Sequence, residues 1–326
     1  MDRKPTNLVL AILVLCGLVL LPDSAAHAVA NGETVDDGEY TFAVKLTMTG
    51  IPTAEGGRRN SSCSGGLISP RWVLTAGHCF RDENDKHVSR PVARRTTATV
   101  GRADLRGDAG HVATVIAVRQ SDTADVALAQ LDRPITDIAP LRLNRTKPRV
   151  GDKVRLAGFG LLDGNATQEP TRMRTGRFRI TSVRQDVVGL AGTAPRADTS
   201  PCPHDSGGPY FSEQKDGSAV VVAVVSHGPT CPHTGADLGG RIDTIARWIT
   251  SVVGKDLKPS PSARPSKQGT PSAEAVAEPP PSEPVAGIGE LNAYQVSVPA
   301  VALVAGMAGI AAVRRRRRPR GGAHRR

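Results

Sequence analysis

Between Tyr40 and Arg241 this chain of 326 residues is a succession of short apolar segments, and the gaps between them contain Gly, Pro, Asp or Asn. Segments of this length and spacing are typical of β-strands joined by turns, because helices need a longer periodic run. The expected strands are residues 42–48, 66–68, 72–75, 97–100, 111–118, 126–131, 153–158, 176–183, 187–191, 209–211, 220–226 and 237–241. Residues 243–253 then predict one amphipathic helix, because Ile245 and Ile249 recur at helical spacing. The sequence therefore predicts an all-β domain closed by a C-terminal helix.

The first 28 residues have the three parts of a secretory signal peptide. Two basic residues near the start precede an apolar run over residues 8–21, and Ala26-His27-Ala28 is a small-x-small cleavage site. We therefore expect residues 1–28 to be removed on export, which would leave Val29 as the first residue of the mature chain.

The C-terminal region predicts a membrane anchor. Residues 255–290 are rich in Pro, Ser, Ala and Glu, so we expect an extended linker without a core. Residues 296–313 carry no charge and, at about 1.5 Å per residue, are just long enough for one transmembrane helix. The arginine-rich tail over residues 314–326 is typical of a cytoplasmic flank, which places the folded domain outside the cell. The interpretation is a single-pass protein of the cell membrane, and shedding of the ectodomain at the linker is left open.

The basic charge of the chain belongs mainly to that tail. The formal net charge is +11, but eight arginines fall within the last thirteen residues, so the rest of the chain carries only +3. Aromatic residues make up 3% of the sequence, which leaves few side chains for base stacking. The folded domain is therefore not expected to bind nucleic acid.

Three separated motifs carry the residue types of nucleophilic catalysis. The string Asp205-Ser206-Gly207-Gly208 sets a serine in a glycine loop, His78 ends the run that begins at Trp72, and Asp125 begins the apolar run that follows it. A serine hydroxyl needs a base, and the base needs an orienting carboxylate. In the order His, Asp, Ser, these motifs resemble the chymotrypsin/trypsin family of serine proteases, in particular its secreted bacterial members. The resemblance extends over residues 29–253.

The resemblance implies two packed six-stranded antiparallel β-barrels within residues 29–254, over about 29–140 and 141–254, with the C-terminal helix after them. It implies that His78 acts as general base, Asp125 orients it, and Ser206 attacks the peptide bond from the cleft between the barrels. Ser226 matches a position whose hydroxyl supports the aspartate. Asp122 lies near Asp125, but the motif favours Asp125.

The resemblance also implies an ion pair and two disulfides. The ammonium of Val29 would pair with Asp205 and so shape the active site. Members of the family usually lose a propeptide first, but here removal of the signal peptide would itself expose Val29, so we expect no separate zymogen step. Cys63 is expected to bond Cys79, and Cys202 to bond Cys231, although four cysteines alone allow three pairings.

One position departs from the family pattern. His204 stands where the family usually has glycine, and its backbone N–H should form the oxyanion hole with that of Ser206. Histidine reaches positive φ more readily than most residues, so the hole can still form. If the peptide flips instead, the alternative is a catalytically weak or silent pseudoprotease that binds peptides or proteins.

The specificity pocket is left undetermined. The floor position is Ser200, not the aspartate that binds basic side chains in trypsin-like members, and the pocket walls would include Ser226 and Gly228. Asp237 stands at a wall position that is often glycine, and could favour basic substrates or be an ordinary loop residue.

The remaining expectations concern partners. The substrate is a protein or peptide, its identity open, and the ectodomain is expected to be monomeric. Nothing predicts an organic cofactor or a metal, since no Cys-x-x-Cys or His-x-x-x-His spacing occurs, and calcium at a surface loop is left open.

Overall fold

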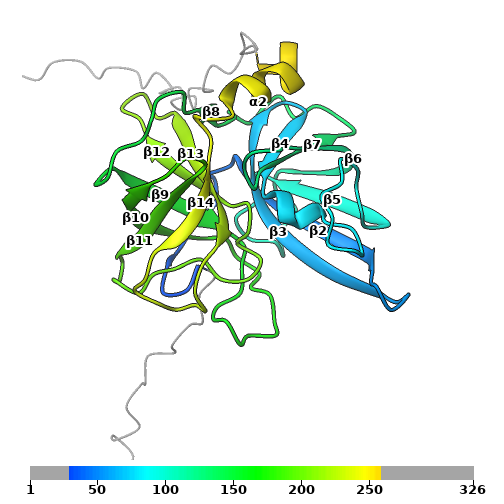
Figure 1. Ribbon diagram of the computed structural model, residues 1–326, viewed down its shortest axis with the longest axis horizontal. Helices are drawn as coiled ribbons and strands as arrows, with labels where there is room; N and C mark the ends of the chain where they lie inside the picture. Colours follow the sequence, from blue (N-terminus) through cyan, green and yellow to red (C-terminus); the bar gives the residue numbers. More distant parts are fainter. Residues whose placement is uncertain (1–28, 258–326) are drawn as a thin grey trace, which may run out of the picture. The chain divides into compact units, whose positions relative to one another are not determined.

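Residues 43–131 close into a six-stranded antiparallel barrel in the computed structural model, which describes residues 29–257 (Figure 1). The strands follow the order β2-β3-β4-β7-β6-β5, and β2 pairs with β5 to complete the ring. Their bounds are β2 (Ala43–Pro52), β3 (Arg58–Ser69), β4 (Trp72–Thr75), β5 (Arg95–Val100), β6 (His111–Gln120) and β7 (Ala127–Leu131). Alternate residues of β2 point inward, so that Val44, Leu46 and Met48 are almost fully buried in the barrel core.

A second ring of six antiparallel strands follows along the chain. The order is β9-β10-β11-β14-β13-β12, and β12 pairs back with β9. The strands are β9 (Lys153–Gly158), β10 (Arg174–Val183), β11 (Val187–Ala194), β12 (Pro209–Glu213), β13 (Ala219–His227) and β14 (Asp237–Arg241). Two short strands attach outside this ring: β1 (Glu33–Thr34) to β10, and β8 (Arg142–Leu143), in parallel, to β13.

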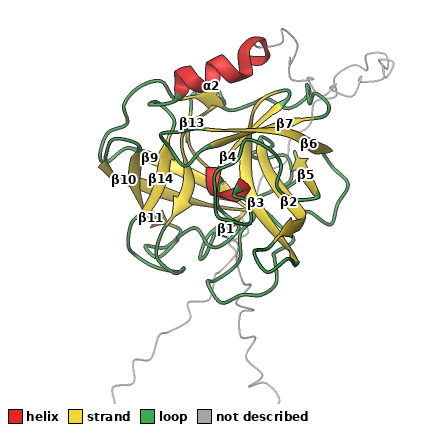
Figure 2. Cartoon of the chain, turned by 45° about the vertical axis from the view of Figure 1, so that its right-hand side comes forward, coloured by secondary structure: helices red, strands yellow, loops and turns green. Residues whose placement is uncertain are grey.

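The two barrels lie side by side and share apolar contacts (Figure 1). Phe42, just before β2, meets Phe211 of β12 edge to face, with ring centroids 5.0 Å apart. The helix α2 (Ala246–Val253) and the 3-10 turn η2 (Gly254–Leu257) end the described chain, and α2 lies across one end of the strands (Figure 2). Ile249 of α2 is fully buried in the core that includes the first barrel.

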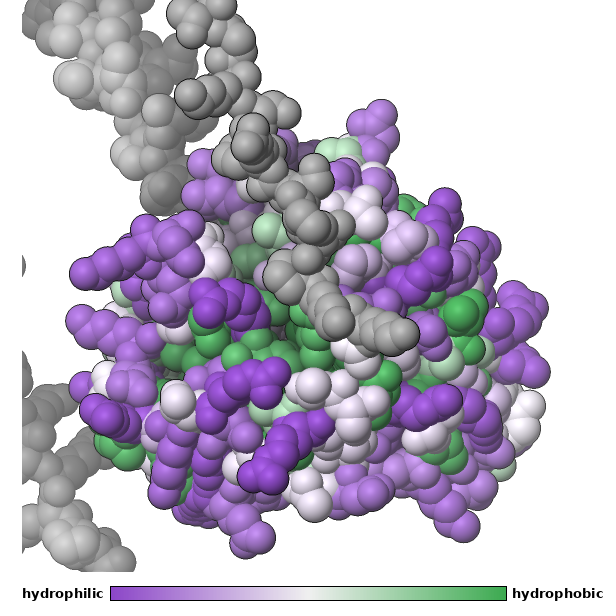
Figure 3. Space-filling model, turned by 90° about the horizontal axis from the view of Figure 1, so that it is seen from above, coloured by the Kyte–Doolittle hydropathy of each residue, from purple (hydrophilic) through white to green (hydrophobic). Residues whose placement is uncertain are grey.

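Most of the surface is polar. Three large hydrophobic residues are exposed among those described: Val112, Ile116 and Val150. The face seen in Figure 3 is mainly hydrophilic, with hydrophobic side chains gathered in its central hollow. No helix within residues 29–257 is long and apolar enough to span a membrane. The expected signal peptide, transmembrane helix, basic tail and nearly all of the linker lie outside the described residues.

The expectation of two six-stranded barrels and a C-terminal helix is confirmed, with corrections to some bounds. The first half of β3, from Arg58 onward, was not expected, because polar residues such as Asn60 and Ser61 fill it. The helix begins at Ala246 rather than at residue 243, since Asp243 lies in the turn that precedes it and is bound by Arg241.

Candidate active site

His78 and Asp125 meet because they lie at the same end of two neighbouring strands. His78 is on the 3-10 turn η1 (Gly77–Phe80), directly after β4, and Asp125 lies just before β7, which is antiparallel to β4. The end of one strand therefore adjoins the start of the other. Asp125 accepts two hydrogen bonds from His78, at 2.8 Å from the backbone N–H to Oδ1 and at 2.7 Å between Nδ1 and Oδ2.

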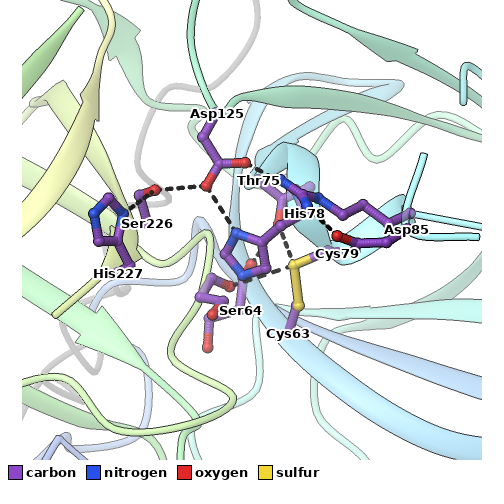
Figure 4. Close-up of polar contacts among 11 residues, drawn as sticks. Cys63, Ser64, Thr75, His78, Cys79, Asp85, Asp125, Ser226 and His227 are labelled. Atoms are coloured by element: carbon purple, nitrogen blue, oxygen red, sulfur yellow. Dashed lines mark hydrogen bonds and ion pairs between the residues drawn. A yellow bond between two sulfur atoms is a disulfide. The ribbon is translucent and has the colours of Figure 1, made fainter. Parts of the chain in front are cut away.

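The second barrel contributes a third group to this pair. Ser226 Oγ, on β13, donates to Asp125 Oδ2 at 2.6 Å, so Asp125 lies between His78 and Ser226 (Figure 4). His227 Nδ1 is 3.2 Å from the same hydroxyl. Burial alone would raise the pKa of Asp125, but the hydrogen bonds from His78 and Ser226 outweigh it and hold the pKa well below its usual range. Asp125 is therefore an anion at neutral pH.

The loop that contains Ser206 is fixed against the first barrel. Ser206 C=O accepts the N–H of Ser64 on β3 at 2.9 Å. Gly207 has φ +80° and is so close to β4 that a Cβ there would lie 2.1 Å from Thr75 Oγ1. Ser206 is thereby held beside the segment that leads from β4 to His78.

Two disulfides brace this region as expected. Cys63 of β3 is bonded to Cys79, the residue after His78, and Cys202 is bonded to Cys231. The first bond ties the turn that carries His78 to the adjacent strand. The second joins the loop before Ser206 to the segment between β13 and β14.

Backbone amides of residues 202–208 separate into those that are used and those that are free. The used donors bond inside the protein: Cys202 to Asp205 Oδ2, Asp205 to Cys202 C=O, Gly207 to Val225 C=O and Gly208 to Asp205 C=O. Residue 203 is proline and has no N–H. Within the described residues, the amides of His204 and Ser206 have no hydrogen-bond acceptor. A buried loop rarely leaves amides unpaired, so these two are available to an incoming oxygen atom.

His204 adopts the conformation that glycine would favour, with φ +77°. Its imidazole Nδ1 is 2.7 Å from Glu169 Oε1, a close contact without the alignment of a hydrogen bond. The other oxygen of Glu169 is 2.8 Å from Lys45 Nζ, whose side chain is only 3% exposed. Attraction to His204, and then to Lys45 and Ser62, outweighs burial and holds the pKa of Glu169 well below its usual range.

Asp205 is fully buried beside the first described residue of the chain. Its carboxylate accepts the N–H of Gly160 at 2.8 Å and of Cys202 at 2.9 Å, and also the backbone N–H of Val29, which is itself fully buried. Burial is the largest influence and raises the pKa of Asp205 to about 6, although these amides and the charge of Lys45 oppose it.

A cavity of about 310 Å³ opens next to Ser206. Three of the expected pocket residues, Ser226, Gly228 and Asp237, line it. Ser200 does not: it is 1% exposed, bridges to Ala30, and accepts the N–H of His233 on its Oγ at 3.2 Å. Ser200, expected at the floor, is therefore buried and is not among the residues that line this cavity.

Asp237 lies at the buried side of this cavity. Its carboxylate is 2% exposed, and Oδ1 is 3.2 Å from His233 Nε2 without the alignment of a hydrogen bond. Burial, followed by repulsion from Asp205, raises the pKa of Asp237 to about 8. The wall is thus built around a carboxyl group that is partly neutral at physiological pH.

Sequence reasoning missed Lys45, Glu169 and His233. The only signal for Lys45 was a cation in a segment expected to be a strand, and the other two occur in loops with no motif. Within residues 29–257 no group of three or more His, Cys, Asp or Glu side chains is arranged to hold a metal ion.

The trypsin family model matches residues 29–249. The chain is 27% identical over 256 residues to the suppressor of tumorigenicity 14 protein homolog of Bos taurus. This aligned region covers 69% of this chain and 28% of that protein. It is 26% identical over 266 residues to transmembrane protease serine 9 of Rattus norvegicus, and this alignment covers 75% of this chain and 23% of the relative. The chain thus spans about a quarter of the length of these relatives. Both relatives are mammalian, so placement among bacterial members stays a prediction.

Proposed function

This chain belongs to the trypsin family of serine proteases, and from that premise we propose that it is an endopeptidase that cuts peptide bonds through Ser206, His78 and Asp125. The observation that carries the proposal is the contact of 2.7 Å between His78 Nδ1 and Asp125 Oδ2, beside the loop of Ser206. A carboxylate on Nδ1 directs the free lone pair of the neutral imidazole to Nε2, which is the tautomer a general base needs.

The reaction proceeds in two halves. His78 removes the proton of Ser206 as Oγ attacks the substrate carbonyl, and a tetrahedral intermediate forms with negative charge on the former carbonyl oxygen. His78 then gives that proton to the leaving amine, which leaves an acyl-enzyme, and water repeats the sequence to release the acid. Asp125 stays ionised throughout and stabilises the imidazolium of His78.

The negative oxygen is received by the backbone N–H groups of His204 and Ser206. Their lack of an acceptor among the described residues supports this role, because a preorganised donor needs no rearrangement when charge develops. The positive φ of His204 supports the enzyme over the silent binding module, since that alternative required the peptide to flip.

The mature N-terminus is proposed to be Val29, formed by removal of residues 1–28 on export. Val29 lies against Asp205 and is fully buried, which supports an ammonium that pairs with this carboxylate. We also propose the remaining domain plan: a linker over residues 255–290, a transmembrane helix over 296–313 and a cytoplasmic tail over 314–326. A monomeric ectodomain would then cut proteins outside the cell.

Covalent labelling tests the function. The full chain is treated with a fluorophosphonate probe, with Ser206→Ala and His78→Ala as matched variants. Labelling of the wild-type chain, absent from both variants, is the expected result. A correctly processed and folded chain that takes no label, or a label that survives Ser206→Ala, would overturn the proposal.

A further inference from the structure

His204 has a conformational problem that glycine would not have. At φ +77° its Cβ approaches the backbone, which costs an ordinary L-residue about 1–2 kcal/mol. The N–H that the oxyanion needs belongs to the peptide between Pro203 and His204, so a turn of φ toward negative values would redirect it. Something in the fold must hold this angle.

Hydrogen bonds reach the carbonyl groups of the peptide units on both sides of His204. The C=O of Pro203 accepts the N–H of Leu161 at 2.8 Å, and in a trans peptide this directs the N–H of His204 away from Leu161. The C=O of His204 accepts a hydrogen bond from the hydroxyl of Ser64 at 3.0 Å. Ser64 Oγ in turn accepts a hydrogen bond from the N–H of Phe159. Both contacts would be equally available to a glycine at position 204.

The side chain of His204 has a fixed position of its own. Its Nδ1 lies 2.7 Å from Glu169 Oε1, and a carboxylate oxygen only accepts, so this contact is favourable when the ring proton is on Nδ1. Glu169 in turn is held by Lys45 Nζ at 2.8 Å and by Ser62 Oγ at 2.5 Å. Lys45 Nζ also donates to Ser62 Oγ at 2.8 Å and to Phe159 C=O at 3.2 Å, so this anchor is built into β2 and β3.

We propose that Glu169, secured by Lys45, is a positioning residue that holds the imidazole of His204 and thereby keeps the His204 N–H directed into the oxyanion hole. The inference rests on the proposed function. Glu169 does not touch the reacting atoms; it supplies through a side chain the fixed geometry that a glycine residue would reach without strain. The role belongs to this chain because it depends on His204.

The test is a cycle of variants in the full chain. Glu169→Gln keeps the shape of the side chain but removes its charge, and we expect kcat to fall about 10- to 100-fold with KM little changed. Loss of one oxyanion-hole donor, roughly 10²–10³-fold, is the upper limit. In the background of His204→Gly, Glu169→Gln should change kcat less than about twofold, because glycine needs no anchor. An equal loss in both backgrounds, or no loss in either, would overturn the inference.

Controls separate positioning from folding. Glu213→Gln removes an exposed carboxylate that binds Tyr40 and Arg155 away from the site, and should leave kcat unchanged. Because Glu169→Gln leaves the buried Lys45 without its partner, Lys45→Met with Glu169→Gln provides a version that has no unpaired charge. This double variant should show the same loss of kcat, and full activity in it would count against the proposal.

A second readout does not require catalysis. In crystal structures, Glu169→Gln should release the imidazole and turn φ of His204 from +77°, whereas Glu213→Gln should not. An unchanged φ in Glu169→Gln overturns the inference, whether or not the chain is active. If the wild-type chain has no peptidase activity but φ of His204 still depends on Glu169, the proposed function is overturned and this inference stands.

Discussion

Ser226 Oγ donates to Asp125 Oδ2 at 2.6 Å, so the carboxylate oxygen that faces His78 is held from the second barrel as well as the first. Replacing Asp125 by Asn should lower kcat about 10⁴-fold, because an amide cannot stabilise the imidazolium or select its tautomer. Ser226→Ala removes one hydrogen bond to a charged group, about 1.5–3 kcal/mol, and should lower kcat/KM roughly 10- to 100-fold. Steady-state hydrolysis of a peptide substrate measures both. An equal loss in the two variants would contradict this ranking.

Gly207 and Gly217 offer a matched pair for testing the loop of Ser206. Both have φ near +80°, but a Cβ at Gly217 meets nothing within 4 Å, whereas at Gly207 it would meet Thr75 Oγ1 and Ala76 N. Gly217→Ala should cost about 1–2 kcal/mol in the free energy of unfolding and leave labelling of Ser206 intact. Gly207→Ala should be more destabilised and lose the label. Denaturant unfolding and labelling together decide this, and intact labelling in Gly207→Ala would refute the close approach.

The pairing of Val29 with Asp205 predicts a dependence on pH. Pairing should raise the pKa of the new α-amino group above its free value of about 8, so its stabilisation is present below pH 8 and is lost as pH rises through the higher folded value. In a chain extended before Val29 this ammonium is absent. Burial raises the pKa of Asp205 to about 6, so the folded state holds a proton that the unfolded state loses near pH 4, and stability falls as pH rises from about 4 to 6.

Denaturant unfolding of the two forms at pH 5, 7 and 10 measures the difference. The form that begins at Val29 should be the more stable at pH 7, with its advantage reduced at pH 10. N-terminal sequencing that finds another first residue, or the same alkaline loss in a form with a blocked amino group, would argue against Val29 as its origin.

Asp237 should make the protein less stable as pH rises. Its pKa is raised to about 8, so the folded state binds a proton that the unfolded state releases near pH 4, and stability falls between these values. Asp237→Asn should therefore flatten the decline between pH 5 and 8 and be more stable than wild type at pH 8. Asp198→Asn is the control. Arg196 lowers the pKa of Asp198, so this residue should affect stability only below about pH 4. A decline that persists in Asp237→Asn would contradict the assignment.

The strands could be predicted wherever apolar residues marked them, as at Trp72–Thr75, which agrees at both ends. The polar half of β3 could not, because its residues pair through the backbone and leave no hydrophobic period. Lys45 shows a related limit: alternation on β2 directs it away from the barrel core, which normally means toward water. Here that face is covered by the segment of Phe159 and Glu169.

The three proposed triad residues could be nominated from the sequence because each lies in a local motif, and the contact of His78 with Asp125 follows from the adjacency of the ends of β4 and β7. The absence of Ser200 from the cavity lining has a different cause. Counting back from Ser206 gives a position in the sequence, but the backbone of Ser200 pairs with Ala30 and its Oγ accepts the N–H of His233, and it does not line the cavity. The contact of His204 with Glu169, 35 positions earlier, depends on where two loops meet, and no spacing in the sequence encodes it.

The contact between Ser226 and Asp125 spans the seam of the two barrels, so each half supplies part of the proposed catalytic unit. The rate of turnover would then depend on how closely the two barrels are packed against each other. The protein would lose activity, with both barrels still folded, if the seam opened by about an ångström. Mechanical tension, hydrostatic pressure or an inhibitor inserted between the barrels could each open it. Activity would return as soon as the seam closed.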